Sequence, residues 1–167
     1  MHYLSPADLR RIDPVALEAL LERSDLVVAA GAGELRGLSA AALLFAGYSV
    51  LDESASLIID TPEAWAGATW RINRRALRFL GRPPLSSVDA LSAGLCDEVI
   101  EGDPGVWLER WKADRSELAL DSAALLISRR GGDRLERAEF ARLFAIGEPQ
   151  RGLEAFLARR KPTFGNE

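Results

Sequence analysis

The sequence predicts an α/β fold in which a strand-containing first part is followed by an all-helical C-terminal third. A short apolar run at 26–30, rich in β-branched residues, is typical of a buried strand. A glycine-rich turn at 31–37 and an Ala/Leu run at 39–45 follow, and the Ala/Leu run favours a helix. Two further apolar runs within 48–59 predict more strands, whereas the patterns from residue 103 onward are helical.

The segment before the first strand is expected to be only partly ordered. Residues 1–12 are expected to form a loosely tied N-terminal arm. Asp13-Pro14 then marks the start of a helix, because Asp is a preferred N-cap and Pro is favoured at the first helical position. We expect this helix to end near Arg23.

Short elements and loops are expected between the glycine turn and the helical third. Thr61-Pro62-Glu63 should end the strand at 55–59, because proline cannot donate to a strand ladder. The elements expected next are a loop at 65–68, a helix at about 70–80 stopped by Gly81, a helix at 88–92 opened by a capping box, and a strand at 95–100.

The C-terminal third is expected to be a series of four helices. Asp103-Pro104 repeats the cap-plus-proline start. The helices are expected at about 104–118, 121–130, 134–146 and 149–160. No flexible linker is evident between the two parts. We therefore predict a single domain over residues 1–167, with an α/β core at 1–102 and a helical region at 103–167.

The length, net charge and cysteine content of the chain exclude some classes of protein. The chain has 167 residues, a formal net charge of −4 and a pI near 5.2, and this acidic balance argues against a nucleic-acid partner. The arginines at 71, 74, 75 and 78 are expected to lie on solvated helix faces. Cys96 is the only cysteine, so an internal disulfide is ruled out, which fits a reducing cytoplasm. We expect Cys96 to be a small core residue on a strand. No leader or membrane-spanning run is evident, so we expect a cytoplasmic protein without a membrane partner.

Several standard catalytic sites are missing from the sequence. His2 is the only histidine and lies at the predicted loose end, so a Ser-His-Asp or Cys-His mechanism lacks its base. No Cys/His spacing suits a metal, and no Walker-type phosphate loop occurs. The order of strand, glycine turn and helix instead aims unpaired helical N–H groups at the turn. This arrangement predicts a site for a negatively charged oxygen.

A dinucleotide site is one alternative interpretation of the glycine turn. Asp52-Glu53 follows the next strand, roughly where an acidic residue could meet a ribose hydroxyl. The glycine spacing departs from GxGxxG by one residue, however, and the helical C-terminal third offers no second βαβ half. This alternative is therefore the more distant one.

Four stretches, taken together and in order, resemble the crotonase, or enoyl-CoA hydratase/isomerase, superfamily. They are 27–45 (VVAAGAGELRGLSAAALLF), 62–67 (PEAWAG), 76–100 (ALRFLGRPPLSSVDALSAGLCDEVI) and 138–164 (AEFARLFAIGEPQRGLEAFLARRKPTF). The last two carry the most specific matches, and GLEAFLARRKPTF at 152–164 is close to a family signature.

The resemblance implies a spiral of ββα turns, followed by C-terminal helices that assemble a homotrimer or a dimer of trimers. Members bind acyl-CoA thioesters and stabilise the thioester enolate with two backbone N–H groups. Coenzyme A would thus be part of the substrate or ligand, with no separate cofactor and no metal. One of the two N–H groups matches Gly37, with Leu38 as its neighbour.

The chain also departs from the family pattern. The family has a longer N-terminal portion that carries the first turns and the other oxyanion N–H, so we expect a divergent, N-terminally truncated member. Of the two acid/base carboxylates of the hydratases, Glu63 matches one. The other matches Ala40 or Leu43, which cannot transfer a proton.

Three more positions are candidates for ligand contacts by this resemblance. Arg36 stands where the family usually has glycine, and it is expected either to pair with Glu34 or Asp60 and fill the pocket, or to bind a carboxylate ligand. Lys161 and Phe164 match a C-terminal element that, in the family, lies near the CoA of a neighbouring subunit.

Two functions from different classes remain open. The first is an acyl-CoA enzyme, such as an isomerase, lyase or thioesterase, with Glu63 as its base. The second is a non-catalytic crotonase-like assembly subunit, which could associate with a full-length crotonase-like partner. Robust hydration is not expected in either case, because that reaction uses both carboxylates.

Overall fold

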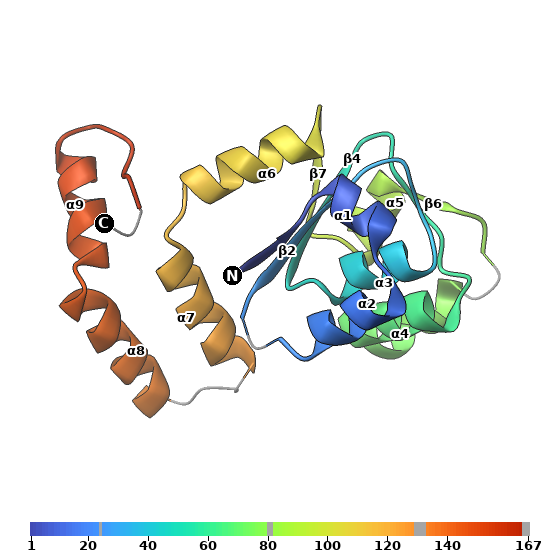
Figure 1. Ribbon diagram of the computed structural model, residues 1–167, viewed down its shortest axis with the longest axis horizontal. Helices are drawn as coiled ribbons and strands as arrows, with labels where there is room; N and C mark the ends of the chain where they lie inside the picture. Colours follow the sequence, from blue (N-terminus) through green and yellow to red (C-terminus); the bar gives the residue numbers. More distant parts are fainter. Residues whose placement is uncertain (24, 80–81, 129–132, 165–167) are drawn as a thin grey trace. The chain divides into compact units, whose positions relative to one another are not determined.

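A computed structural model describes residues 1–23, 25–79, 82–128 and 133–164 (Figure 1). Strands and helices are interspersed up to β7, and the elements after β7 that the structure describes are helices. The strands are β1 (His2–Leu4), β2 (Val27–Gly31), β3 (Glu34–Leu35), β4 (Tyr48–Asp52), β5 (Ser56–Leu57), β6 (Leu85–Ser86) and β7 (Glu98–Ile100). The helices are α1 (Pro6–Arg11), α2 (Pro14–Leu21), α3 (Leu38–Phe45), α4 (Pro62–Ile72), a 3₁₀ helix (Asn73–Phe79), α5 (Ser87–Ala93), α6 (Pro104–Ala113), α7 (Glu117–Ser128), α8 (Asp133–Ala145) and α9 (Glu148–Leu157).

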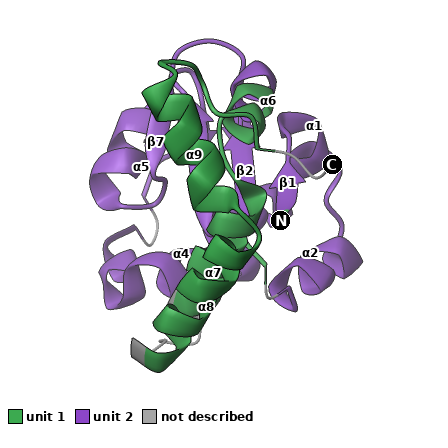
Figure 2. Cartoon of the chain, turned by 90° about the vertical axis from the view of Figure 1, so that its left-hand side faces the viewer, with its two compact units in different colours: residues 1, 24–26, 109–167 green, residues 2–23, 27–108 purple. Residues whose placement is uncertain are grey.

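The chain divides into two compact units, which Figure 2 colours separately. One unit comprises residues 2–23 and 27–108 and holds every described strand together with α1 to α5. The other comprises residues 1, 24–26 and 109–167 and holds α7 to α9. The division between these units falls within α6, and the predicted boundary after residue 102 stays a prediction. The single-domain organisation stays a prediction.

A four-stranded parallel sheet forms the centre of the first unit, in the order β1-β2-β4-β7. All five residues of β2 are buried, which is why this strand is continuously apolar in sequence. The strands β3, β5 and β6 form a second, smaller sheet in that order. β3 and β5 are parallel, and β5 and β6 are antiparallel.

Helix α3 lies at the centre of the core. It packs against α1, α2, α4 and β2, and its residues Ala40 to Leu44 are completely buried. Its contact with α4 is close enough to require a glycine, because a Cβ on Gly67 would lie 2.8 Å from the Cβ of Leu44. The short side chains of the AAALL run are thus explained by helices and sheet that approach α3 from several sides.

The predicted loose arm at residues 1–12 is wrong. β1 pairs in parallel with β2, and Leu4 lies opposite Ala29. α1 begins with a capping box between Ser5 and Asp8, and its Leu9 is 1% exposed. A three-residue strand shows no periodicity of its own, so only its partner strand identifies it.

The predicted loop at 65–68 is also wrong, because α4 runs through it without interruption. Thr61 is the N-cap of α4, and its side chain accepts a hydrogen bond from the N–H of Ala64. α4 ends at Ile72, where Asn73 adopts a φ of +56°, and a 3₁₀ helix continues to Phe79. The predicted helix at 70–80 is therefore two elements, and its predicted end at residues 80 and 81 lies outside the described residues.

The elements after the 3₁₀ helix agree better with the expectations from the sequence. α5 confirms the short helix, with Ser86 as its N-cap, and β7 confirms the last three residues of the strand expected at 95–100. All four C-terminal helices are present, although α6 ends at Ala113 rather than 118. The expected helix end at 129–132 lies outside the described residues.

Within the helical unit, polar contacts link neighbouring helices. Glu139 of α8 accepts hydrogen bonds from Ser122 of α7 and from Arg142, and these bonds lower the pKa of the Glu139 carboxyl. None of the helices described for residues 1–23, 25–79, 82–128 and 133–164 has both the length and the apolar character that a membrane crossing needs.

Candidate functional site

The turn between β2 and α3 is held in a conformation that only glycine adopts readily. Gly37 is the N-cap of α3 and has φ +57° and ψ −125°. Ser39 fixes the turn from inside the helix: its Oγ accepts a hydrogen bond from the N–H of Arg36 at 3.0 Å and donates one to the Arg36 carbonyl at 2.8 Å. In the part of the chain that the structure describes, the N–H groups of Gly37 and Leu38 donate to no acceptor. The turn therefore presents two adjacent donors at the positive end of the α3 dipole.

The N-terminus of α4 lies beside this turn. The methyl group of Thr61 would be 3.8 Å from a Cβ placed on Gly37. An ion pair joins the same two segments, because the guanidinium of Arg36 lies 2.5 Å from the carboxylate of Asp60. The starts of two helices thus meet at one point, and both direct positive dipole ends toward it.

Glu63 lies in the first turn of α4, next to this meeting point. Its side chain is exposed, and a carboxylate in the first turn is favoured by the helix dipole. The two positions that match the family's second carboxylate, Ala40 and Leu43, are 0% exposed and belong to the core of α3. The structure therefore brings Gly37, Leu38 and the start of the helix bearing Glu63 together, with one carboxylate rather than two.

Arg36 pairs with Asp60, which is one of its two expected partners. The Arg36 side chain is 61% exposed and that of Asp60 is 34% exposed, so the pair lies at the surface. An exposed pair of this kind contributes about 0–1 kcal/mol to stability and is weakened by salt. It can consequently open or exchange partners at little cost.

The backbone N–H of Ser5, which follows β1, already donates a hydrogen bond within the chain. β1 and β2 are parallel neighbours, so their carboxyl ends meet at one edge. The first N–H after β1, that of Ser5, donates to the Asp8 carboxylate at 2.8 Å, and the Ser5 hydroxyl donates to the same oxygen at 2.6 Å. These hydrogen bonds lower the pKa of the Asp8 carboxyl. Sequence reasoning missed this feature, although the Ser5-x-x-Asp8 pattern is a recognisable capping box.

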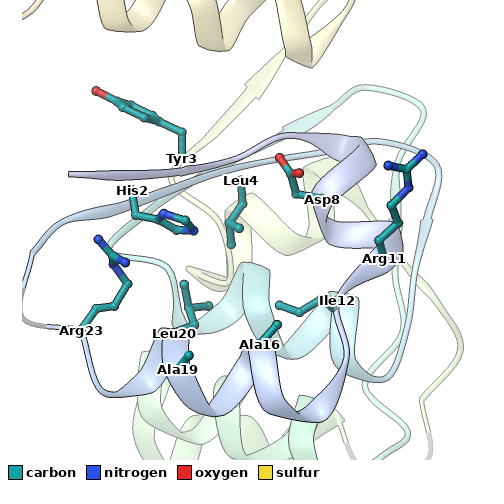
Figure 3. Close-up of a pocket in the computed structure, with 10 residues that line it drawn as sticks. All are labelled: His2, Tyr3, Leu4, Asp8, Arg11, Ile12, Ala16, Ala19, Leu20 and Arg23. Carbon is teal, nitrogen blue, oxygen red and sulfur yellow. The ribbon is translucent and has the colours of Figure 1, made fainter.

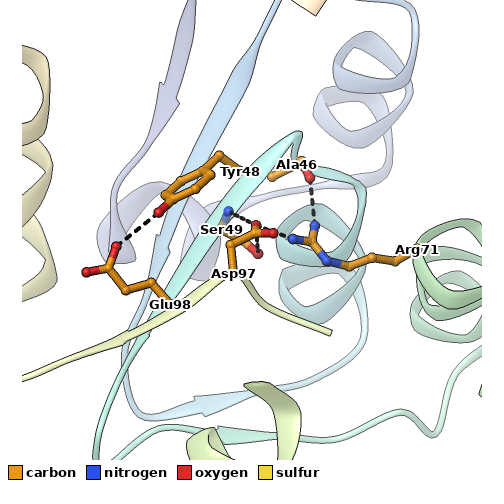
Figure 4. A network of polar contacts seen from close by, with 6 residues as sticks. All are labelled: Ala46, Tyr48, Ser49, Arg71, Asp97 and Glu98. Atoms are coloured by element: carbon orange, nitrogen blue, oxygen red, sulfur yellow. Dashed lines mark hydrogen bonds and ion pairs between the residues drawn. The ribbon is translucent and has the colours of Figure 1, made fainter. Parts of the chain in front are cut away.

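A polar network holds the far ends of α3 and α4 against the sheet (Figure 4). Arg71 of α4 donates to the carbonyl of Ala46, just after α3, at 2.8 Å, and it pairs with Asp97, just before β7. The Asp97 carboxylate also accepts the N–H of Ser49, on β4, at 2.7 Å. The expectation that Arg71 is solvated is wrong, because its side chain is only 9% exposed; Arg74, Arg75 and Arg78 are exposed as expected.

Comparison with known proteins gives a consistent result at the level of structure alone. No family model matches the sequence, and no curated protein matches it. An enoyl-CoA hydratase/carnithine racemase from Magnetospirillum magneticum is 22% identical, with a TM-score of 0.68 over 91% of this chain. A putative enoyl-CoA hydratase/isomerase from Mycobacterium abscessus is 23% identical, with a TM-score of 0.71 over 96% of this chain. An enoyl-CoA hydratase subunit I from Geobacillus kaustophilus is 21% identical, with a TM-score of 0.66 over 96% of this chain.

The chain has the crotonase fold. The predicted resemblance is confirmed for the architecture, and the α/β core with its helical C-terminal region is the fold class expected. The chain spans 64%, 70% and 74% of the three solved chains, respectively. Identities near 20% establish the fold and leave the activity to be argued from the site.

The two C-terminal candidates belong to the helical unit of this crotonase fold. The Nζ of Lys161 lies 3.2 Å from the Asp114 carboxylate, and both side chains are exposed. Phe164 lines a cavity of about 170 Å³ together with residues of α6, α7 and α9. Gly37 and Glu63 belong to the other unit. The predicted contact of Lys161 and Phe164 with CoA stays a prediction.

Cys96 lies in the buried core of the strand-containing unit. Cys96 is 3% exposed and burial raises the pKa of its thiol to about 11, so the expected core role fits, although it precedes β7 rather than lying on the strand. Among the described residues, no group of three or more His, Cys, Asp or Glu side chains is placed to hold a metal ion.

Proposed function

We propose that the chain binds an acyl-CoA thioester through the N–H groups of Gly37 and Leu38, which donate to the thioester carbonyl oxygen. The observation that carries this proposal is the turn at Gly37, which has a positive φ at the start of α3 and whose two N–H groups have no acceptor among the described residues. A carbonyl oxygen that gains negative charge is the ligand such a pair of donors favours.

Glu63 is the base in this proposal. Its carboxylate takes a proton from the carbon next to the thioester carbonyl, and the electron pair of that C–H bond moves onto the carbonyl oxygen. The two N–H groups stabilise the resulting enolate, and the protonated Glu63 returns the proton to the same or a conjugated carbon. A chain with one such carboxylate is suited to proton exchange or isomerisation, whereas water addition would use a second carboxylate, and Ala40 and Leu43 stand at its expected positions.

A pair of variants at Leu38 tests the donor directly. Leu38 is the first residue of α3, a position where proline is tolerated, so Leu38→Pro removes the N–H and leaves the helix able to form. Leu38→Ala shortens the same side chain and keeps the N–H. With acetyl-CoA, we expect a thermal shift for the wild type and Leu38→Ala but a much smaller shift for Leu38→Pro. Equal shifts for both variants would contradict the proposal.

Hydrogen–deuterium exchange at the substrate tests the base. In D₂O, wild-type protein should catalyse loss of the α-protons of butyryl-CoA, followed by NMR. Glu63→Gln should lower this rate by a factor of roughly 10²–10⁴, because it removes the proton acceptor. Glu101→Gln, which changes another exposed carboxylate, is the matched control and should exchange at the wild-type rate.

A non-catalytic assembly subunit is the second candidate function. The observation that favours it is a set of exposed apolar side chains on α8 and α9 and between them, namely Phe140, Phe144, Ile146, Leu153, Phe156 and Leu157. The rings of Phe140 and Phe144 lie 4.6 Å apart and form one surface. Such a surface suits association with a second copy or with a full-length crotonase-like partner. A stable oligomer that shows no thermal shift with acetyl-CoA would favour this function.

A further inference from the structure

The 3₁₀ helix that follows α4 carries positive charge that no nearby acidic residue offsets. Residues 64–88 contain five arginines and no aspartate or glutamate, whereas the whole chain has 25 acidic and 21 basic residues. Within the part of the chain that the structure describes, the guanidinium groups of Arg74, Arg75, Arg78 and Arg82 pair with no carboxylate. This stretch is therefore a basic surface on an acidic chain.

The 3₁₀ helix turns two of its three rows of side chains toward solvent. In such a helix the side chains at i and i+3 eclipse one another. One row includes Ala76, which is 1% exposed and packs in the core. The other two rows are Arg74 with Leu77 and Arg75 with Arg78, and all four of these side chains are exposed.

Two of the guanidinium groups are positioned by the chain without being neutralised by it. The guanidinium of Arg78 lies over the ring of Phe79, 4.7 Å from the ring centroid. The Nε of Arg82 donates to the backbone carbonyl of Arg78 at 3.2 Å. Because a guanidinium has five N–H donors in a planar fork, it can still donate two parallel hydrogen bonds to one carboxylate. We call the exposed side chains of Arg74, Arg75, Leu77, Arg78 and Arg82 the arginine surface.

The cationic side chains at the cavity between β1, α1 and α2 differ in this respect (Figure 3). The cavity has a volume of about 440 Å³ and is lined by His2, Arg11 and Arg23 among others. His2 and Arg23 already interact with other groups of the chain, and Arg11 lies one turn of α1 from Asp8. The positive charge of the arginine surface has no such internal partner among the described residues.

We propose that the arginine surface docks an acidic segment of a partner protein. Carboxylates of the segment accept hydrogen bonds from Arg75 and Arg78, which share one row of the helix. An apolar side chain of the segment packs on Leu77, which is 60% exposed in the neighbouring row. The surface follows the C-terminal end of α4, whereas the Gly37 turn lies beside the N-terminal end, so this docking does not depend on the function proposed for the turn.

The composition of the stretch favours a protein as the occupant. Trp70, near the end of α4, is also 60% exposed, and exposed tryptophan and arginine without acidic residues are typical of the centre of protein interfaces. A nucleic-acid interface is normally much more positive than a chain with a net charge of −4. Insertion into lipid relies on a continuous apolar helix face, and in this 3₁₀ helix the exposed rows hold a single apolar side chain, Leu77.

Fluorescence anisotropy with a labelled acidic peptide tests the proposal on the whole chain. The peptide EELEELEE should bind, and its affinity should fall as salt is raised, because exposed charge pairs are screened. The peptide QQLQQLQQ keeps the leucines and should not bind. Leu77→Ser should weaken binding of the acidic peptide about threefold or more, because it removes the apolar contact. Val15→Ser, which changes a 73% exposed position of α2, should have no effect.

A matched pair of double variants locates the site. The double variant Arg75→Gln with Arg78→Gln should weaken binding of EELEELEE about tenfold, the combined effect of two surface pairs. Arg134→Gln with Arg137→Gln removes two exposed arginines at the same spacing on α8, where Glu136 lies between them, and should leave the affinity unchanged. All four arginines are exposed, so both double variants should fold, which circular dichroism checks.

Each contrary result overturns the proposal. Failure of the wild-type chain to bind EELEELEE, or equal binding of QQLQQLQQ, would remove the acidic segment as the ligand. Equal losses in the two double variants would show that net charge alone attracts the peptide.

Other occupants give distinct results, and each of them also overturns the proposal. Tighter binding of inorganic triphosphate than of the peptide, or binding to phosphatidylglycerol vesicles that is lost with Arg75→Gln and Arg78→Gln, would assign the arginines to phosphate groups. A wild-type oligomer that dissociates in the same double variant would make a second copy of the chain the occupant. The thioester proposal is tested separately, with acetyl-CoA and the variants at Leu38.

Discussion

Replacing Arg71 by methionine should destabilise the strand-containing unit more than any other single arginine change there. The substitution keeps the aliphatic length of the side chain but removes the hydrogen bond to the Ala46 carbonyl and the ion pair with Asp97. Hydrogen bonds to charged groups are worth about 1.5–3 kcal/mol each when buried. The Asp97 side chain is 35% exposed and keeps its hydrogen bond from Ser49, so solvent and this remaining donor reduce the loss.

We therefore expect Arg71→Met to lower the free energy of unfolding by about 2–3 kcal/mol, which corresponds to a fall in Tm of roughly 4–12 °C for a chain of this size. Urea unfolding followed by tryptophan fluorescence measures the change. Arg74→Met is the matched control, because Arg74 is exposed and its guanidinium makes no ion pair within the described residues. Its effect should stay within about 0.5 kcal/mol. Equal effects of the two substitutions would refute the role assigned to the network.

Three further predictions concern packing, protonation and association. Gly31→Ala should cost about 1–3 kcal/mol in urea unfolding, because its new Cβ would lie 2.6 Å from a Leu35 methyl group in a filled core; a neutral result would show that the core can relax there. The stability contributed by the buried Cys96 thiol should be fully present below pH 9 and should fall as the pH rises toward 11, since its pKa is raised to about 11 and the unfolded chain loses the proton first; Cys96→Ala should lack this part of the pH dependence, and identical pH profiles would contradict the assignment. Phe156→Asp should reduce self-association measured by light scattering, because Phe156 is 78% exposed on the apolar surface of α9, and a wild-type monomer at micromolar concentration would rule out that surface as a self-contact.

The predictable parts of the fold are those whose signal lies within one stretch of sequence. β2 and α3 could be predicted because a continuous apolar run, a glycine turn and an Ala/Leu run occur in succession. α5 could be predicted because its cap is local. β1 could not, because three residues become a strand only through pairing with β2. α4 was mistaken for a loop at Gly67, since the reason for that glycine is the approach of Leu44 from another helix.

The same distinction applies to the candidate site. The donor turn at Gly37 follows from the order of strand, glycine and helix. The candidate role of Glu63 came from the resemblance to a family, whereas only the structure shows that the start of α4 lies beside the turn. The ion pair between Arg36 and Asp60 was one of two expected pairings. The hydrogen bond from the Ser5 N–H to Asp8 could not be placed at the end of a strand from the sequence, because β1 shows no pattern of its own. Arg71 and Asp97 lie 26 residues apart, and no pattern in the sequence connects them.

Infrared spectroscopy of bound acetyl-CoA tests the central claim most directly. If the N–H groups of Gly37 and Leu38 donate to the thioester oxygen, the carbonyl stretching frequency should fall when acetyl-CoA binds to wild type or Leu38→Ala, since hydrogen bonding weakens the C=O bond. It should fall less with Leu38→Pro, which lacks one donor. A carbonyl frequency that stays at its value in water with saturating wild-type protein, or that falls equally with Leu38→Pro, would contradict the account.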